Sequence, residues 1–412
     1  MGKPKIRFEG YSEDWEQRKL SDYLSVSGQK NRDEKYDKED VLSVSGDYGI
    51  VNQIEFQGRS FAGASVTNYG VVETNDVVYT KSPLKANPYG IIKSNKGKPG
   101  IVSTLYAVYH PNDITDSEFV QVYFEQDARM NSYMHPLVNK GAKNDMKVSA
   151  ENALKGEVIF PKLDEQRQIS DYFRRLDTII TLHQRKCDEI KTLKKYMLQK
   201  MFSQNGEKVP EIRFNGFTED WEQRKLGDIT TKIGSGKTPK GGAAAYKDDG
   251  IALIRSQNVN GDRVDLSDVV FIDEQTDEDM KNSRVLKGDV LLNITGASIG
   301  RSAVFTRELR ANVNQHVCII RTKGSDASPE FIQLNIISSN GQNQIDSFQA
   351  GGGREGLNFH QIGKMEFLYP GIEEQQKIGQ YFANLDHLIT LHQRKCDELQ
   401  SIKKFMLQNM FI

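Results

Sequence analysis

Several features that would point directly to a fold or an activity are scarce in this 412-residue sequence. Its three cysteines, Cys187, Cys318 and Cys396, cannot form a disulfide framework and suit a reducing compartment. The 55 basic and 56 acidic residues leave a net charge of −1, which excludes nucleic-acid binding by bulk positive charge. No apolar run reaches the ~18 residues of a membrane span, and no apolar signal segment follows Met1. We therefore expect a cytoplasmic protein whose function depends on local patches.

The sequence does contain an internal duplication, which can decide the architecture of a protein. Residues 6–22, IRFEGYSEDWEQRKLSD, recur at 212–228 as IRFNGFTEDWEQRKLGD, with 13 of 17 positions identical. Residues 163–202 recur at 372–411 with 24 of 40 positions identical. The chain is therefore one unit of roughly 200 residues written twice.

The two segments between these repeated blocks, 23–162 and 229–371, have nearly the same length but share little sequence. A conserved frame around two diverged bodies indicates one scaffold that presents two different specificities. The predicted organisation has four parts: a first recognition domain with its conserved N-terminal segment (1–162), a central conserved helix (163–203), a conserved linker with a second recognition domain (204–371), and a C-terminal conserved helix (372–412).

Each of the repeated 40-residue blocks predicts one long amphipathic helix of about 60 Å, because its apolar residues recur every three or four positions. A narrow apolar seam favours packing of the two helices on each other as a coiled coil. The predicted fold is α+β, with two globular domains joined by two long antiparallel helices that have internal pseudo-twofold symmetry. The seam residues are Ile169, Phe173, Leu176, Ile180, His183, Cys187, Ile190, Leu193, Met197 and Met201 in the first helix, and Ile378, Phe382, Leu385, Ile389, His392, Cys396, Leu399, Ile402, Met406 and Met410 in the second.

The centre of each predicted helix contains a histidine and a cysteine four residues apart, His183 with Cys187 and His392 with Cys396. Two such pairs from antiparallel helices could bind zinc. Alternatively, the histidines form a polar layer that sets the register of the helices, and the cysteines are small buried side chains. We expect no bound metal.

The duplication also predicts where the ends of the chain lie. Residues 204–228 lead from the end of the first long helix into the second body. By pseudo-symmetry, residues 1–22 should occupy the equivalent place at the end of the second helix, so that the two ends of the chain meet.

The pattern resembles the DNA-specificity subunit of type I restriction–modification systems over essentially the whole chain. Two features that carry the resemblance are the duplicated segment Glu219 to Asp228 and the turn Gly234 to Pro239. A third is a repeated helix start, which consists of Pro161, Glu165, Gln166, Ile169, Leu176 and Asp177 in one copy and of Pro370, Glu374, Gln375, Ile378, Leu385 and Asp386 in the other.

This resemblance implies a non-catalytic subunit in which each body reads one half of a bipartite site in double-stranded DNA. The long helices would separate the two readers and bind two methyltransferase subunits, and through them restriction subunits. S-adenosylmethionine, ATP and magnesium would belong to those partners, so that the chain itself needs no cofactor. The partner-facing residues that we expect near the middle of the helices are Gln184, Arg185, Lys186, Gln393, Arg394 and Lys395.

Candidate DNA contacts come from basic and amide side chains in the two bodies. Residues 77–108 combine five lysines with interleaved tyrosines and contain no acidic residue after Asp76, which favours contact with phosphates. Arg255, Gln257 and Asn258 have the side chains that read guanine and adenine edges. The full set of candidates is Lys81, Lys85, Tyr89, Lys93, Lys96, Lys98 and Lys143 in the first body, and Lys237, Lys240, Arg255, Gln257, Asn258, Arg301, Asn314, Gln315 and Arg354 in the second.

Two motifs that suggest an enzyme do not withstand inspection. The run from Gly234 to Thr238 resembles a phosphate-binding loop, but Thr231 stands where that loop needs its first glycine, and Pro239 would prevent a following helix. Asn87-Pro88-Tyr89 lacks the second proline of an adenine methyltransferase motif. The alternatives left open are a scaffold that binds proteins through its diverged bodies and a stand-alone enzyme; salt-dependent DNA binding would distinguish the first from a DNA reader.

Overall fold

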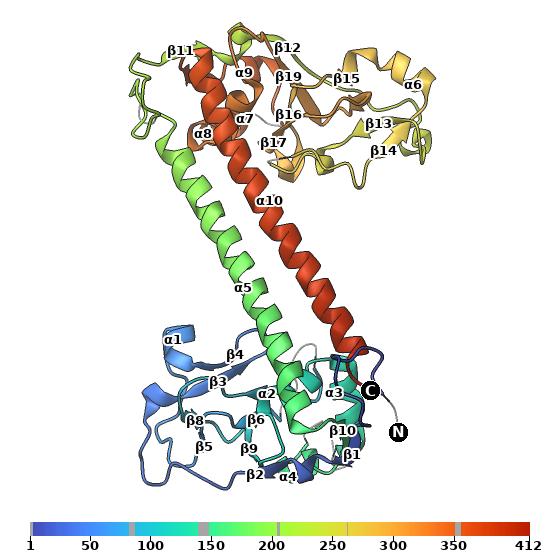
Figure 1. Ribbon diagram of the computed structural model, residues 1–412. Helices are drawn as coiled ribbons and strands as arrows, with labels where there is room; N and C mark the ends of the chain where they lie inside the picture. Colours follow the sequence, from blue (N-terminus) through green and yellow to red (C-terminus); the bar gives the residue numbers. More distant parts are fainter. Residues whose placement is uncertain (1–2, 82–86, 139–147, 204–206, 262, 351–355) are drawn as a thin grey trace. The chain divides into compact units, whose positions relative to one another are not determined.

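A computed structural model of the chain describes residues 3–81, 87–138, 148–203, 207–261, 263–350 and 356–412 (Figure 1). The chain divides into two compact units: the first combines residues 1–183 with 394–412, and the second contains residues 184–393. Both predicted long helices are present, as α5 (Leu163–Lys200) and α10 (Ile372–Asn409). Each long helix therefore contributes one half to each unit.

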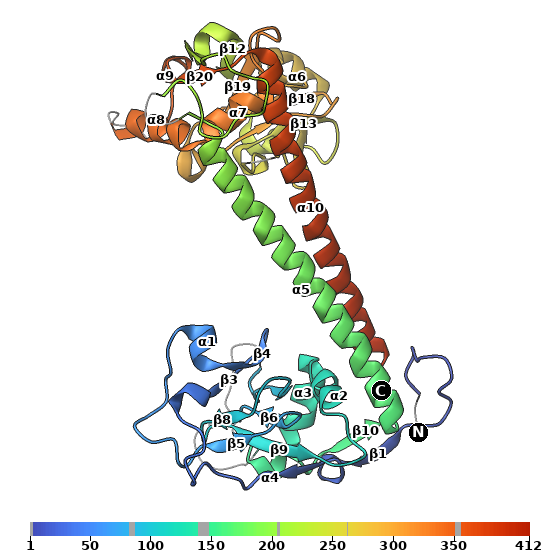
Figure 2. The same cartoon turned by 60° about the vertical axis from the view of Figure 1, so that its left-hand side comes forward.

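Within each unit, α5 and α10 run antiparallel and pack on each other (Figures 1 and 2). In the first unit the Sγ atom of Cys396 lies 3.7 Å from the carbonyl oxygen of Ile180. In the second unit the Sγ atom of Cys187 lies 3.9 Å from the carbonyl oxygen of Ile389. Both cysteines are free thiols and are fully buried. The predicted antiparallel helix pair is confirmed, and its cysteines are small buried side chains of the seam.

The predicted seam is wrong at Leu193 and Ile402. These side chains are 43% and 44% exposed, whereas their neighbours Lys194 and Lys403 are only 17% and 14% exposed. A lysine can pack its aliphatic stem along an apolar surface while its ammonium group reaches a polar partner. The lysines therefore occupy the seam, and the apolar residues beside them face outward.

Each seam lysine forms an ion pair with the opposite helix. The Nζ atom of Lys194 lies 2.5 Å from Asp386, and that of Lys403 lies 2.6 Å from Asp177 at the equivalent position of the other unit. Lys403 also reaches Glu125 at 2.6 Å. Burial alone would lower the pKa of Lys403, but the two carboxylates outweigh it and raise this pKa. Because the pairs are interhelical, they favour the antiparallel register.

The possible metal ligands of the helices are divided between the units, with His183 and Cys396 in the first and Cys187 and His392 in the second. In the described part of the chain, no group of three or more His, Cys, Asp and Glu side chains is arranged to hold a metal ion. The contact of each cysteine with a helix carbonyl is that of a packed side chain. The polar-layer role of the histidines stays a prediction.

Each repeated unit starts and ends its body with one pair of strands. β1 (Glu16–Lys19) pairs antiparallel with β10 (Glu157–Phe160), and β11 (Glu222–Lys225) pairs with β20 (Glu366–Tyr369). The two ladders have the same register, since the first residue of β1 opposes the last residue of β10 and the same holds for β11 and β20. Each body is thus inserted between two paired strands of a conserved frame.

We call residues 6–22 the N-terminal strap and residues 212–228 the internal strap. The backbone N–H of Ile212 donates to the carbonyl oxygen of Lys200 at 2.9 Å, where α5 ends. Equivalently, the N–H of Ile6 donates to the carbonyl oxygen of Asn409 at 3.0 Å, where α10 ends. The prediction that the first 22 residues occupy the equivalent place at the end of the second helix is confirmed for the strap.

Each strap is also fixed to the start of a long helix by a buried ion pair. Arg7 donates from Nε and Nη2 to the two carboxylate oxygens of Glu165, both at 2.7 Å, and Arg213 contacts Glu374 with the same two distances. The glutamates are only 2% and 1% exposed. Such a bidentate pair fixes orientation as well as distance.

A conserved glutamine of each long helix joins the frame to the body. The side chain of Gln166 donates to the carbonyl oxygen of Pro161 and accepts the N–H of Asp116, and Gln375 does the same with Pro370 and Ser328. Asp116 and Ser328 are the N-caps of one helix in each body, α2 (Ser117–Tyr123) and α7 (Pro329–Ile337). The same frame residue thus orients a different body in each unit.

The two bodies share one topology although their sequences have diverged. The first contains an antiparallel sheet in the order β2-β9-β6-β7, and the second contains the equivalent sheet β12-β19-β16-β17. The strands of the first sheet are Leu24–Val26, Ala107–Pro111, Val77–Tyr79 and Ile92–Ser94, in the order given. Those of the second are Thr230–Ser235, Val317–Thr322, Val290–Asn293 and Ser302–Val304.

A second set of strands covers this sheet in each body. The second body contains the sheet β14-β13-β18-β15, in which β13 and β18 are parallel. The first body has the pairs β3-β4 and β5-β8, linked by a parallel bridge between Val41 and Ile101. In the second body the strands are β14 (Val270–Ile272), β13 (Ile251–Ile254), β18 (Ala311–Val313) and β15 (Arg284–Val285). In the first body they are β3 (Leu42–Ser45), β4 (Gly49–Asn52), β5 (Gly70–Val72) and β8 (Gly100–Val102).

Short helices complete each body. The first contains α1 (Gln53–Gln57), α3 (Asp127–Met134) and α4 (Ala150–Ala153) besides α2. The second contains α6 (Glu274–Asp279), α8 (Ser339–Ala350) and α9 (Phe359–Gly363) besides α7.

In the second body, one buried carboxylate fixes α6 to the adjacent sheet. Asp277 is 1% exposed and accepts hydrogen bonds from Arg284, Arg310 and Asn312. Burial alone would raise its pKa, but the hydrogen bonds from Arg284, Asn312 and Arg310 outweigh it and lower the pKa of Asp277 to about 2.

An aromatic core lies where strap, body and helices meet. In the first unit, Trp15 of the strap and Phe411 after α10 have ring centroids 6.2 Å apart, and both contact Phe119 of α2. The second unit repeats this with Trp221 and Phe202, 6.4 Å apart. Full burial of such a ring stabilises the fold by about 1.5–3 kcal/mol. The matching tryptophans of the repeat thus hold equivalent cores together.

Candidate nucleic-acid interface

In the second body, the connections between strands meet at one end of the sheets, which we call the second tip: residues 236–240, 255–258, 294–301 and 314–316. The N–H of Gly236 donates to the carbonyl oxygen of Asn314, whose own N–H donates to that of Ile254. A Cβ atom at Gly236 would lie 1.6 Å from the carbonyl oxygen of Val313, so only glycine fits there. The glycine of the motif Gly234 to Thr238 therefore allows the backbone at Gly236 to pack closely against that of Val313 and Asn314.

The residues that follow this motif do not form a phosphate-binding loop. After Lys237 and Thr238, the nearest helical segment is a single 3-10 turn at Gly242–Ala245. A P-loop needs an α-helix directly after its threonine, because the helix N-terminus holds the phosphates. The geometry thus favours a polar tip over a nucleotide site.

The second tip brings together most of the predicted contacts of its body. Lys237, Lys240, Arg301 and Gln315 are exposed on it. Lysine and arginine side chains in this setting can contact DNA phosphates, and the amide of glutamine can contact base edges. This combination matches the chemistry of a DNA-reading surface.

Three other predicted residues of this tip are engaged within the protein. Arg255 donates to the carbonyl oxygen of Asp268 at 3.0 Å, and Gln257 donates to its carboxylate at 2.5 Å. Asn258 is 2% exposed and its amide donates to the carbonyl oxygens of Asp265 and Asp268. Asn258 therefore holds the loop, whereas Arg255 and Gln257 each donate one hydrogen bond to Asp268.

The first body has an equivalent first tip, formed by residues 27–29, 46–48, 80–81 and 103–106 of the corresponding connections. Lys81 donates to the carbonyl oxygen of Thr104 at 2.9 Å, and burial lowers the pKa of Lys81. Tyr89 is half-buried and lies between β6 and β7, where its carbonyl oxygen accepts the hydroxyl of Tyr79 at 2.6 Å. Lys81 and Tyr89 thus lie at this end of the sheet.

The structure does not bring the rest of the basic run to the first tip. Lys96 and Lys98 follow β7 at its other end, and Lys96 pairs with Glu118 at 3.3 Å. Lys93 lies within β7 and is 8% exposed; burial lowers the pKa of its ammonium group. The run is continuous in sequence, but β7 separates its lysines: Lys81 lies at the first tip, Lys93 is buried within the strand, and Lys96 and Lys98 lie at the opposite end. Lys85, Lys143 and Arg354 lie outside the described residues.

The predicted partner-facing residues lie on the surface of the helices. Arg185, Lys186, Gln393, Arg394 and Lys395 are exposed, and Gln184 is half-buried. The two lysines form matching pairs within their helices, Lys186 with Glu189 and Lys395 with Glu398, both at 3.2 Å.

Sequence reasoning missed a second surface on the helices. Four apolar residues of each long helix are 40–65% exposed, and they occupy matching positions of the repeat. The first unit carries Ile179, Leu182, Ile402 and Phe405, and the second carries Leu388, Leu391, Leu193 and Tyr196. The available signal was that six of them are apolar in both copies although they lie outside the predicted seam; Leu193 and Ile402 were assigned to the seam. Exposed apolar side chains kept in both copies indicate an interaction surface.

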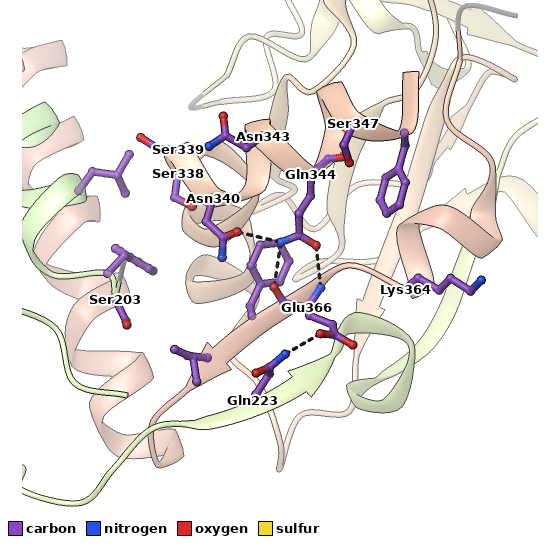
Figure 3. Close-up of a pocket in the computed structure, with 15 residues that line it drawn as sticks. Ser203, Gln223, Ser338, Ser339, Asn340, Asn343, Gln344, Ser347, Lys364 and Glu366 are labelled. Carbon is purple, nitrogen blue, oxygen red and sulfur yellow. Dashed lines mark hydrogen bonds between the residues drawn. The ribbon is translucent and has the colours of Figure 1, made fainter. Parts of the chain in front are cut away.

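A polar cavity of about 620 Å³ lies in the second unit between the end of α5, α8 and β20 (Figure 3). There the amide of Gln344 accepts the N–H of Glu366 and donates to its carbonyl oxygen, at 2.9 and 2.8 Å. Gln344 thus satisfies the edge of β20 as a neighbouring strand would. The cavity lies where the frame meets the second body, and none of the residues of the second tip line it.

The structure thus defines a protein with two recognition domains of one topology and different tips, set in a duplicated helical frame. The family model of the type I restriction modification DNA specificity domain matches residues 12–192 and again 218–401. The chain belongs to this family.

Relatives and solved structures agree with this assignment. The chain is 20% identical, over 402 residues, to the type I restriction enzyme MjaVIII specificity subunit of Methanocaldococcus jannaschii, covering 95% of this chain and 91% of that one. It is 24% identical over 199 residues to the putative MjaX specificity subunit of the same organism, which covers 47% of this chain and only 46% of the relative. It matches the crystal structure of the type I restriction-modification system S subunit from M. genitalium with a TM-score of 0.63 and 14% identity, over 100% of this chain and 99% of that one.

Among the described residues, none of the helices has the length and apolar character that would let it cross a bilayer.

Proposed function

We propose that this chain is the DNA-recognition subunit of a type I restriction–modification complex, and that each tip reads one half of a bipartite site in double-stranded DNA. One observation supports this most directly: the two bodies have the same strand order, but different residues occupy equivalent connections at their tips. Two readers that recognise different half-sites require a constant support and variable contacts.

The second tip shows how such a division of contacts would work. Lys237, Lys240 and Arg301 can neutralise phosphates, which gives affinity without sequence information. The exposed amide of Gln315 can contact base edges, which gives specificity. At the second tip, local positive charge would compensate for the near neutrality of the whole chain.

The partners in this proposal are two methyltransferase subunits, and through them restriction subunits. Each unit presents an equivalent set of four exposed apolar residues on its half of the helix pair. Two equivalent surfaces on one chain fit two copies of one partner. S-adenosylmethionine, ATP and magnesium would be bound by those partners, and the recognition chain would perform no chemistry.

The test is to express the chain with its methyltransferase partner and to map the methylated adenines in host DNA. Replacing residues 23–162 by the corresponding body of a homologue should change one half of the methylated site and leave the other intact. Replacing residues 229–371 is the matched control and should change only the other half. A change in both halves after either exchange would contradict two independent readers.

Two measurements distinguish the other classes of function. Binding of the complex to its site should weaken steeply with salt, because each neutralised phosphate releases a counterion. A scaffold for proteins would show no such dependence on DNA. The purified chain without partners should neither transfer methyl groups nor hydrolyse ATP, and turnover in that assay would contradict a non-catalytic subunit.

A further inference from the structure

The loop Asn314 to His316 of the second tip is held by backbone hydrogen bonds. Its backbone contacts three neighbouring segments: Asn314 donates to Ile254 and accepts from Gly236, and the carbonyl oxygen of His316 accepts the N–H of Ile294 at 3.0 Å. The side chain of Asn314 is 8% exposed and accepts the N–H of His316 at 3.1 Å. Such a loop can place one exposed side chain with little conformational freedom.

The imidazole of His316 has a partner at each ring nitrogen. Its Nδ1 atom lies 2.5 Å from the hydroxyl of Thr295, and its Nε2 atom lies 2.9 Å from the amide nitrogen of Gln315. Because the amide nitrogen can only donate, Nε2 accepts, and the proton of the neutral ring is on Nδ1 and is donated to Thr295. The ring therefore restrains the orientation of the Gln315 amide.

This arrangement uses only one of the hydrogen-bonding groups of Gln315. The amide oxygen and the second N–H remain for an outside partner, and Gln315 is exposed. When His316 accepts the N–H that points away from the amide oxygen, the free edge has one acceptor and one donor side by side. In the major groove, adenine presents the complementary pair, the N6 amino group as donor and N7 as acceptor.

We propose that Gln315 reads one adenine in the half-site of the second body, and that His316 and Thr295 are positioning residues for it. The inference rests on the proposed function. Among the other amides of this tip, Asn258 and Asn314 are buried and hold loops, and the exposed Gln257 is bonded to an aspartate of another loop, Asp268. Exposed Lys237 and Arg301 on neighbouring connections supply phosphate contacts beside the amide.

The experiment uses the full chain in complex with its methyltransferase partner and a library of randomised duplex DNA. Selected duplexes are sequenced, and the preference at each position of both half-sites is measured. Gln315→Ala should reduce the preference for adenine at one position of one half-site by about 5- to 150-fold. Preferences in the other half-site, and affinity for DNA without a site, should not change.

Matched variants separate positioning from folding. Thr295→Val removes the hydroxyl at nearly constant volume and should weaken the same adenine preference, whereas Thr295→Ser keeps the hydroxyl and should restore it. Gln257→Ala removes an amide of the same tip that is engaged with Asp268, and should leave that position unchanged. Thermal unfolding of each variant confirms that the body is folded.

The outcomes distinguish this inference from the proposed function. If the unmodified complex selects no sequence, the proposed function is wrong. If it selects two half-sites and Gln315→Ala changes none of their positions, or changes a position occupied by another base, the adenine reader is wrong while the proposed function stands. Loss of all binding by a folded Gln315→Ala complex would also overturn a contact to a single base.

Discussion

The buried pair of Arg7 and Glu165 allows a quantitative test of how the N-terminal strap is held. Arg7→Met keeps most of the side-chain volume but removes both hydrogen bonds to a carboxylate that is 2% exposed. Breaking a buried pair from one side typically costs about 3–5 kcal/mol, because it leaves a charge without compensation. Beyond Arg7, the described contacts of Glu165 include only one weak donor, the indole N–H of Trp15 at 3.4 Å.

The double variant Arg7→Met with Glu165→Gln should recover much of this loss, since replacing both partners removes the unpaired charge. For a unit of roughly 200 residues, a loss of about 3–5 kcal/mol lowers the unfolding temperature by roughly 6–20 °C. The ion pair of Arg213 with Glu374 is the matched pair in the second unit, because its two hydrogen bonds have the same lengths as those of Arg7 with Glu165. Arg213→Met is therefore the corresponding variant.

The assay combines calorimetry with hydrogen exchange of the strap strands. Arg7→Met should accelerate exchange in β1 and leave β11 protected, and Arg213→Met should do the reverse. A cost below about 1 kcal/mol, as measured for exposed ion pairs, would refute the reasoning. Equal acceleration in both strands would show that the straps are not held separately.

Three further predictions concern other parts of the molecule. The pKa of Asp277 is about 2 in the folded state, below the unfolded value near 3.9, so its contribution to stability is present above about pH 4 and is lost as the pH falls toward 2. In Asp277→Asn, the free energy of unfolding should therefore depend less on pH between about 4 and 2. On the proposal that two methyltransferase subunits dock on the exposed apolar residues, Leu182→Asp or its equivalent Leu391→Asp should each remove one of them, measured as the mass of the complex; removal of neither would contradict docking on these surfaces. Inserting seven residues after His183 and after Gln393 keeps the helical seam. It should lengthen the DNA between the two half-sites by about three base pairs in the methylation map. An unaltered separation of the half-sites would show that the helices do not set it.

The frame could be predicted from sequence because its signals are local and are present twice. The long helices end within two residues of the predicted blocks, and the place of the N-terminal strap followed from the internal one. The error at Leu193 and Ile402 has a physical cause. Periodicity favoured the apolar residue, but Lys194 and Lys403 can bury their stems and pair with an aspartate of the opposite helix. A partner 192 residues away in sequence is not visible to a periodicity argument.

The tips could be predicted only in part, because they are assembled by long-range pairing of short strands. The basic run after Asp76 is one patch in sequence, but β7 buries Lys93 and carries Lys96 away from Lys81. Conversely, Gln315 and Thr295 lie in different connections and meet only at His316. Residue type suggested glutamine as a base reader, but only the fold could show which amides are already engaged.

The junctions between frame and body have a consequence for how such chains change over time. Both bodies are inserted between strands of identical register, and both are oriented by the same glutamine contact to the N-cap of a helix, α2 in the first body and α7 in the second. Either body could therefore make these two junction contacts in either position. A chain that acquired its second body in both positions by recombination would keep the strand pairing and the glutamine contact, and the site that it reads would become an interrupted palindrome.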